Sequence, residues 1–123
     1  MEGKNIMFVE DSPTMRRIIH NAIKRLPFNE IIEAENGVDA LNKLKNSPVD
    51  VILTDWNMPE MNGQEFVEKL RSNDSWKNIP VIMITTRGMQ EDVLNAIKYG
   101  VNGYLVKPFT PELLQQKLEE LVI

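Results

Sequence analysis

The alternation of short apolar runs with amphipathic stretches constrains the fold of this 123-residue chain more than any other feature of its sequence. The first, third and fourth runs are apolar almost throughout, which is typical of strands covered on both faces. The stretches between the runs repeat their apolar residues with a helical period. Five strands are therefore predicted, near residues 5–9, 30–34, 51–54, 80–84 and 103–106.

The predicted helices carry recognisable signals at their ends. Ser12 and Pro13 precede the first helix, as an N-cap and a proline at the first helical position. Gly100 is predicted to end the fourth helix. The order of elements is then strand and helix repeated five times, which predicts an α/β fold with a doubly wound parallel sheet and helices on both faces.

Composition excludes several classes of protein. The net charge of −4 and the scattered basic residues disfavour nucleic-acid binding. The chain has no cysteine, so it has no disulfide and no thiolate metal site. No apolar run approaches the roughly 18 residues of a membrane span, and the first residues lack the apolar core of a secretion signal. We therefore expect a cytoplasmic protein that binds neither nucleic acid nor membrane.

Polar side chains follow four of the predicted strands. Glu10 and Asp11 follow the first strand, Asp55 the third, Thr85 the fourth and Lys107 the fifth. Ligands of doubly wound sheets bind beyond the carboxyl ends of the strands, so these side chains are predicted to share one site. Each also has an ordinary interpretation: an acid can cap a helix, a lysine can lie on the surface, and a threonine suits any strand.

Three carboxylates at one edge repel one another, and burial increases the cost. Mg²⁺ would remove the repulsion and prefers carboxylate, carbonyl and water ligands, so a magnesium site is predicted. Asp55 is the acid best placed to attack phosphorus. Lys107 could then hold a phosphoryl oxygen as a point charge, and Thr85 could donate its hydroxyl to another.

These residues occur in the order and spacing of a known family. From about residue 5 to residue 121 the chain resembles the receiver domains of response regulators. The motifs that carry the resemblance are Glu10-Asp11, Thr54-Asp55, Met58-Pro59, Gly63, Thr85, Gly103-Tyr104 and Lys107-Pro108-Phe109. Within the family it is most similar to the CheY-type single-domain chemotaxis regulators, in residues 12–17, 36–41 and 55–59.

The resemblance implies a flavodoxin-like strand order of 2-1-3-4-5 and a single receiver domain over residues 1–123. It implies that Asp55 accepts a phosphoryl group from a sensor histidine kinase, so the protein is a switch rather than an enzyme. It implies that Asp11, Asp55 and the backbone carbonyl of Asn57 bind Mg²⁺, with Glu10 acting through a water. Thr85 and Lys107 would bind the phosphoryl oxygens.

The resemblance also implies how the signal leaves the protein. Tyr104 would be an aromatic switch that turns inward when Thr85 moves, and the Lys107-Pro108 bond would be cis. The fourth helix, fifth strand and fifth helix would bind the flagellar motor switch protein, and a phosphatase could be a further partner. We expect the protein to be a monomer.

The sequence departs from its subgroup at three positions. Glu10 stands where an aspartate is usual, and its longer side chain should still reach the metal water. Thr86 and Arg87 stand where a smaller residue and an acid are common. We expect them to change the rate of dephosphorylation and the choice of partner.

Other functions stay open at this point. A haloacid dehalogenase-type hydrolase also has a nucleophilic aspartate, but it needs an acid two residues later, where this chain has Asn57. A flavodoxin-like cofactor module needs a phosphate-binding loop in place of Glu10-Asp11. A stand-alone phosphorelay receiver, or a receiver of a larger transcription regulator, would share every motif.

Overall fold

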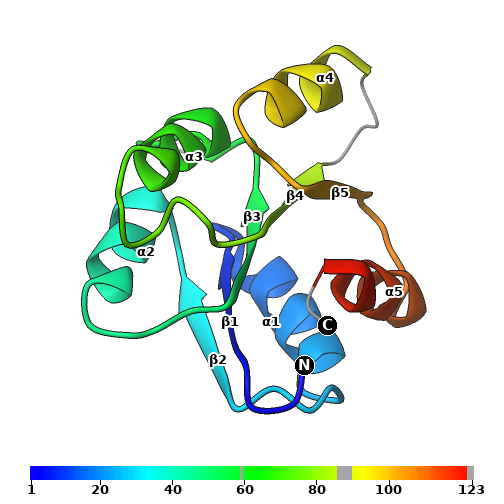
Figure 1. Ribbon diagram of the computed structural model, residues 1–123. Helices are drawn as coiled ribbons and strands as arrows, with labels where there is room; N and C mark the ends of the chain where they lie inside the picture. The colour runs from blue at the N-terminus through cyan, green and yellow to red at the C-terminus, as the bar shows by residue number, and fades with distance from the viewer. Residues whose placement is uncertain (59, 86–89, 122–123) are drawn as a thin grey trace.

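The computed structural model of the protein describes residues 1–58, 60–85 and 90–121, and of residues 90–92 it describes the backbone alone. Within these residues, strands and helices alternate along the chain (Figure 1). The strands are β1 (Asn5–Val9), β2 (Glu30–Ala34), β3 (Val51–Asp55), β4 (Val81–Thr85) and β5 (Gly103–Val106). The helices are α1 (Pro13–Ile23), α2 (Gly37–Leu44), α3 (Gly63–Arg71), α4 (Gln90–Lys98) and α5 (Pro111–Leu121).

The five strands form one parallel sheet in the order β2-β1-β3-β4-β5. Successive side chains of a strand point to opposite faces of the sheet, so the apolar residues of the strands pack in two hydrophobic cores, one on each face. In β3, for example, Ile52 packs in the core beneath α2, α3 and α4, whereas Leu53 packs in the core beneath α1 and α5. The predicted doubly wound fold and its strand order are confirmed.

Two strands end later than the sequence suggested. Asp55 is the last residue of β3 and pairs with Ile84, and Thr85 is the last residue of β4 and pairs with Val106. The prediction stopped where the apolar side chains stop, but a strand continues for as long as its backbone is paired. Asp55 and Thr85 are therefore held by the sheet itself rather than by a following loop.

The predicted helix signals are present. Ser12 Oγ accepts a hydrogen bond from the Met15 N–H at 3.3 Å, and Pro13 is the first residue of α1. Gly100 lies just beyond α4 with φ of +103°, in the left-handed region that favours glycine. The Lys107–Pro108 peptide bond is cis, as predicted.

Arg71 joins three segments at the far edge of the sheet from the strand exits. Its Nη2 donates to the Gly100 carbonyl at 2.8 Å, and its Nη1 donates to the Ile79 carbonyl at 2.9 Å. A Cβ atom at Gly100 would lie 2.9 Å from Arg71 Nε, so the glycine also makes room for the guanidinium. The end of α3, the segment before β4 and the segment before β5 are thereby fixed together.

Among the described helices, none has the length and apolar character needed to cross a membrane.

Candidate functional site

Three carboxyl groups meet at the carboxyl ends of β1 and β3. One oxygen of each of Glu10, Asp11 and Asp55 lies within 4.8 Å of the other two. The two strands are neighbours, and Val9 pairs with Thr54, which places the next residues of each strand side by side. Glu10 is 2% exposed and Asp55 is 7% exposed, whereas Asp11 is open to solvent. The structure therefore brings together the three acids that the sequence singled out.

Lys107 enters the same site from the end of β5. Its Nζ lies 2.6 Å from Glu10 Oε1 and 3.5 Å from Asp55 Oδ2. Its backbone N–H donates to the Thr85 carbonyl at 2.6 Å. The predicted closeness of Lys107 and Asp55 is present, but the shorter contact of the ammonium is with Glu10. The extra methylene of the glutamate carries its carboxylate into reach of the lysine.

Burial dominates the electrostatics of these acids. It raises the pKa of Glu10, while the Lys107 ammonium and the Ser12 N–H favour the charged form. Burial likewise raises the pKa of Asp55, against the attraction of Lys107 and the N–H groups of Asn57 and Trp56. The carboxylates are thus only partly compensated by the protein, which is the condition under which a cation binds favourably.

Arg16 supports the loop that carries the first two acids. Its Nη1 donates to the carbonyl oxygens of Glu10 at 2.9 Å and of Asp11 at 3.2 Å. This role of Arg16 was not predicted from the sequence. A signal was available, because helical side chains point back toward the amino end, and Arg16 lies one turn after the N-cap Ser12.

The loop after β3 is closed by a tight contact between Trp56 and Gly63. The Gly63 N–H donates to the Trp56 carbonyl at 2.8 Å. A Cβ atom at Gly63 would lie 2.5 Å from Trp56 Cε3 and 2.9 Å from its Cα, so only glycine fits. Asn57 lies in this loop directly after the buried Trp56. This contact fixes the position of Trp56, directly after Asp55.

The predicted switch residues lie on neighbouring strands. Thr85 is buried at the end of β4, while Tyr104 on β5 is 40% exposed. Tyr104 pairs with Met83, two residues before Thr85, so all three side chains point to the same face of the sheet. The Nζ of Lys117 lies 5.8 Å from the centre of the tyrosine ring. The ring of Tyr104 is thus in an outward position.

Some residues singled out in the sequence lie outside the described part of the chain. They are Pro59, Thr86 and Arg87.

The donor set of the site fits Mg²⁺. All three side chains that can approach one point offer carboxylate oxygens, which are the ligands that this hard cation prefers. The ammonium of Lys107 at the rim adds a group that attracts anions. The arrangement can therefore hold a divalent cation next to a phosphoryl group.

Comparison with known proteins shows to which family this chain belongs. The model of the response regulator receiver domain matches residues 6–119. The chain belongs to the response-regulator receiver family. This membership sets aside the hydrolase and the cofactor module considered from the sequence.

Other receivers resemble this one closely in sequence. The chemotaxis protein CheY1 of Helicobacter pylori is 54% identical over 115 residues, which is 93% of this chain and 93% of that protein. A chemotaxis protein CheY homolog of Campylobacter jejuni is 51% identical over 118 residues, which is 95% of this chain and 91% of that protein.

Solved receivers share the fold. The chemotaxis protein CheY4 of Vibrio cholerae has a TM-score of 0.92 at 33% identity and covers 98% of this chain and 99% of its own. The receiver domain of a sensor histidine kinase from Pseudomonas aeruginosa has a TM-score of 0.87 at 28% identity, with 97% of both chains covered. That structure holds a magnesium ion coordinated in its active-site cleft.

Proposed function

We propose that this receiver is a phosphorylation-dependent switch of a two-component system, in which Asp55 takes a phosphoryl group from a phosphohistidine of a sensor histidine kinase. One observation carries the proposal above all others. A buried aspartate at the end of the central strand has two carboxylates within 4.8 Å and an ammonium group 3.5 Å away. Carboxylates this close together repel one another, and a bound cation would relieve that repulsion.

The proposed transfer has few steps for the protein. An Asp55 carboxylate oxygen attacks phosphorus, the P–O bond forms, and the P–N bond to the histidine breaks as its imidazole leaves. When bound, Mg²⁺ supplies charge neutralisation. Asp11, Asp55 and the Asn57 carbonyl would hold it, with Glu10 acting through a water. The chain would contribute mainly by positioning the reacting groups and by neutralising charge, as is general in phosphoryl transfer.

Lys107 and Thr85 would bind the oxygens of the transferred group. The Lys107 ammonium now contacts Glu10 at 2.6 Å, so it would turn from that carboxylate toward the phosphoryl oxygens. The acyl phosphate adds about −1.5 to −2 charge by analogy with other phosphorylated side chains, which attracts both groups. The protein would promote its own phosphorylation and dephosphorylation, but it would not turn over a separate substrate. We therefore regard it as a switch and not as an enzyme.

The output is proposed to run through Thr85 and Tyr104. A shift of Thr85 toward the new phosphate would vacate space on the face of the sheet that both side chains share. Tyr104 could then turn inward from its exposed position, which gives a two-state element biased by a local charge. The changed surface of α4, β5 and α5 would bind a partner.

The named relatives suggest which partner. They are chemotaxis proteins, so the flagellar motor switch protein is the proposed target, and a phosphatase could reset the signal. We propose that residues 1–123 act in the cytoplasm as one monomeric receiver unit.

A phosphorylation assay tests the proposal. The protein is incubated with a small phosphodonor such as acetyl phosphate, with Mg²⁺ or with chelator, and the adduct is mapped by mass spectrometry. We expect one acid-labile phosphoryl group on Asp55 that requires Mg²⁺. A label of equal extent in Asp55→Asn, or one that is indifferent to chelator, would show that the phosphoacceptor or the metal requirement is misassigned.

A further inference from the structure

A groove runs between α2 and α3, on the face of the molecule away from α1 and α5. It consists of two adjoining hollows of about 470 and 410 Å³, which share Lys45 and Trp76 as lining residues. Each volume falls within the range of about 300–1,000 Å³ that is usual for ligand pockets. We call these two hollows together the α2–α3 groove.

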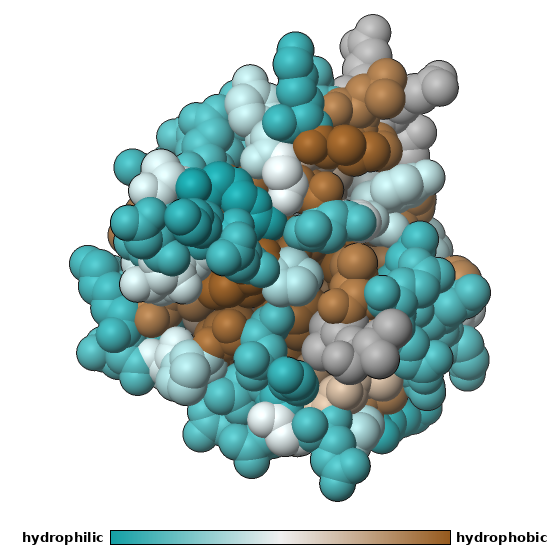
Figure 2. Space-filling view, viewed as in Figure 1, coloured by the Kyte–Doolittle hydropathy of each residue, from teal (hydrophilic) through white to brown (hydrophobic). Residues whose placement is uncertain are grey.

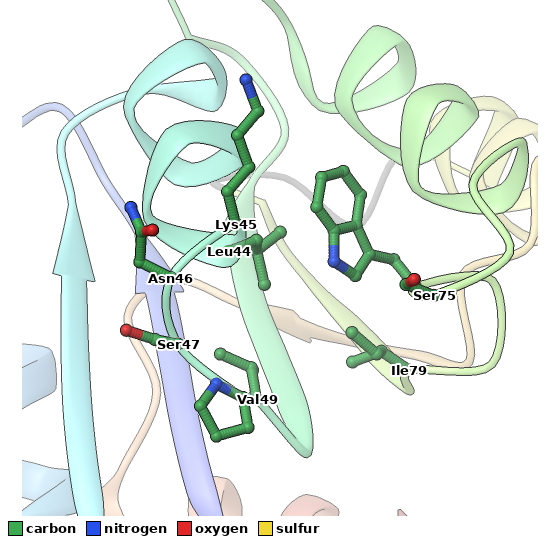
Figure 3. A pocket seen from close by; sticks show the side chains of 9 residues that line it. Leu44, Lys45, Asn46, Ser47, Val49, Ser75 and Ile79 are labelled. Atoms are coloured by element: carbon green, nitrogen blue, oxygen red, sulfur yellow. The ribbon is translucent and has the colours of Figure 1, made fainter.

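The floor of the groove is apolar. Figure 3 shows Leu44, Val49 and Ile79 around the first hollow, and these side chains come from α2, from the segment before β3 and from the segment before β4. Val38 lines the second hollow and is 43% exposed. In Figure 2 hydrophobic surface is visible between the hydrophilic outer surfaces of α2 and α3. An apolar floor framed by two helices is the setting in which an amphipathic helix can lie.

The rim of the groove is positively charged, although the chain as a whole carries a net charge of −4. Lys45 lines both hollows and Lys69 lines the second, and among the described lining residues there is no carboxylate. Neither ammonium forms an ion pair or hydrogen bond with another described residue. By contrast, Lys43 of the same helix α2 is paired with Asp39 at 3.2 Å.

The groove is distinct from the site around Asp55 but is connected to it. Met61 lines the second hollow, and it belongs to the loop that follows Asp55. Its side chain also packs tightly against α2, since a Cβ atom at Gly37 would lie 2.8 Å from Met61 Sδ. A ligand in the groove would therefore touch a loop that begins at the site.

We propose that the α2–α3 groove binds an amphipathic helix of a partner protein whose polar face is acidic. Two large apolar side chains one or two turns apart would enter the two hollows. Glutamates or aspartates beside them would meet Lys45 and Lys69, which gives orientation and selectivity. A basic helix of the same shape would be repelled by the same two ammonium groups.

The test uses the whole, unphosphorylated chain, so its outcome does not depend on the proposed phosphorylation. The probe is a synthetic peptide of about 15 residues, with leucine at helical spacing and glutamate at the other positions. A second peptide has lysine in place of every glutamate. Binding is followed by heteronuclear NMR up to about 1 mM peptide. We expect the acidic peptide to shift the indole N–H of Trp76 and the amides of Lys45 and Lys69, and to bind at least about tenfold more tightly than the basic peptide.

Charge reversal supplies the matched control. The double variant Lys45→Glu, Lys69→Glu should bind the acidic peptide at least about tenfold more weakly and should now prefer the basic peptide. The variant Arg17→Glu, Lys24→Glu changes the net charge equally at exposed positions of α1 and its C-cap, on the opposite face of the sheet from the groove, and it should keep the preference of the wild type.

Three results would overturn the proposal. The first is an absence of binding at about 1 mM peptide. The second is a set of shifts centred outside the groove, for example on α1 or α5. The third is an acidic-peptide affinity that falls equally in both double variants, because net charge and not the groove would then be responsible.

Discussion

Removing the charge of Asp55 should stabilise the metal-free protein, against the usual trend for substitutions in a buried site. The Asp55 carboxylate is repelled by Glu10, whose nearest oxygen lies within 4.8 Å, and attracted by the Lys107 ammonium at 3.5 Å. At an effective dielectric constant of about 20 the repulsion is at least about 3.5 kcal/mol, because 4.8 Å is an upper limit on the distance, and the attraction is about 5 kcal/mol. The exposed Asp11 adds a further repulsion that also raises the pKa of Asp55, so the attraction of Lys107 is largely offset.

The cost of desolvating the Asp55 charge then decides whether Asp55→Asn is more or less stable than the wild type. Burial is the largest cause of the raised pKa of Asp55, and an amide avoids the cost of burying a charge. Asp55→Asn keeps the shape of the side chain and one oxygen that can accept a backbone N–H. We therefore expect the variant to be more stable than the wild type in chelator by about 1–2 kcal/mol at neutral pH.

The effect should depend on pH in a defined direction. An acid whose pKa is raised by folding destabilises the folded state at every pH at which the unfolded chain has lost the proton. The penalty is absent below the unfolded pKa of about 4, grows as the pH rises from that value to the raised pKa of the folded protein, and is complete above it. The advantage of Asp55→Asn should thus be greatest at neutral pH and should vanish toward pH 4.

Urea unfolding in chelator measures the difference. With a slope of about 2 kcal/mol per molar urea, the midpoint of Asp55→Asn should rise by about 0.5–1 M. Addition of Mg²⁺ should then stabilise the wild type more than the variant. Asp74→Asn is the matched control, because its side chain is 99% exposed, and its midpoint should not move. A midpoint of Asp55→Asn below that of the wild type in chelator would refute the argument from desolvation.

Three further substitutions test other parts of the structure. Arg71→Lys keeps the charge but loses the planar set of donors to backbone carbonyls, so the free energy of unfolding should fall by about 2–3 kcal/mol in urea. Gly63→Ala places a methyl group 2.5 Å from the Trp56 ring, so the free energy of unfolding should fall by about 1–3 kcal/mol and the fluorescence of Trp56 should change. An unchanged spectrum and an unchanged stability would contradict the contact. Thr85→Ala should still be phosphorylated but should lose the phosphorylation-dependent gain in affinity for the proposed output partner, and a gain that survives would place the switch elsewhere.

Periodicity predicted the fold because the hydrophobic effect acts through it. Apolar runs covered on both faces, separated by amphipathic stretches, are compatible with few arrangements other than a doubly wound sheet. The same reasoning placed Glu10, Asp55 and Lys107 at one edge, since the carboxyl ends of parallel strands lie together. The last residue of a strand was less predictable, because Asp55 and Thr85 end the apolar pattern while their backbones stay paired.

Contacts between segments far apart in the chain were not predictable. Whether the Lys107 ammonium meets Glu10 or Asp55 depends on one methylene and on the course of the loop after β5, and neither leaves a periodic signal. Arg71 is a stronger case, because most of its partners are backbone carbonyl groups, among them those of Ile79 and Gly100. Every residue has a backbone carbonyl, so no sequence pattern marks those to which the half-buried guanidinium donates.

The separation of the site residues along the chain has a consequence for synthesis. Glu10, Asp55 and Lys107 come from the first, third and fifth strands, and the lysine follows all but the last helix. A nascent chain that has emerged only as far as β4 already carries both acids but lacks the ammonium group between them. Such a chain would present an uncompensated anionic surface to a phosphodonor, which is itself anionic. The proposed phosphoryl transfer to Asp55 therefore requires that synthesis has passed β5, because Lys107 follows that strand.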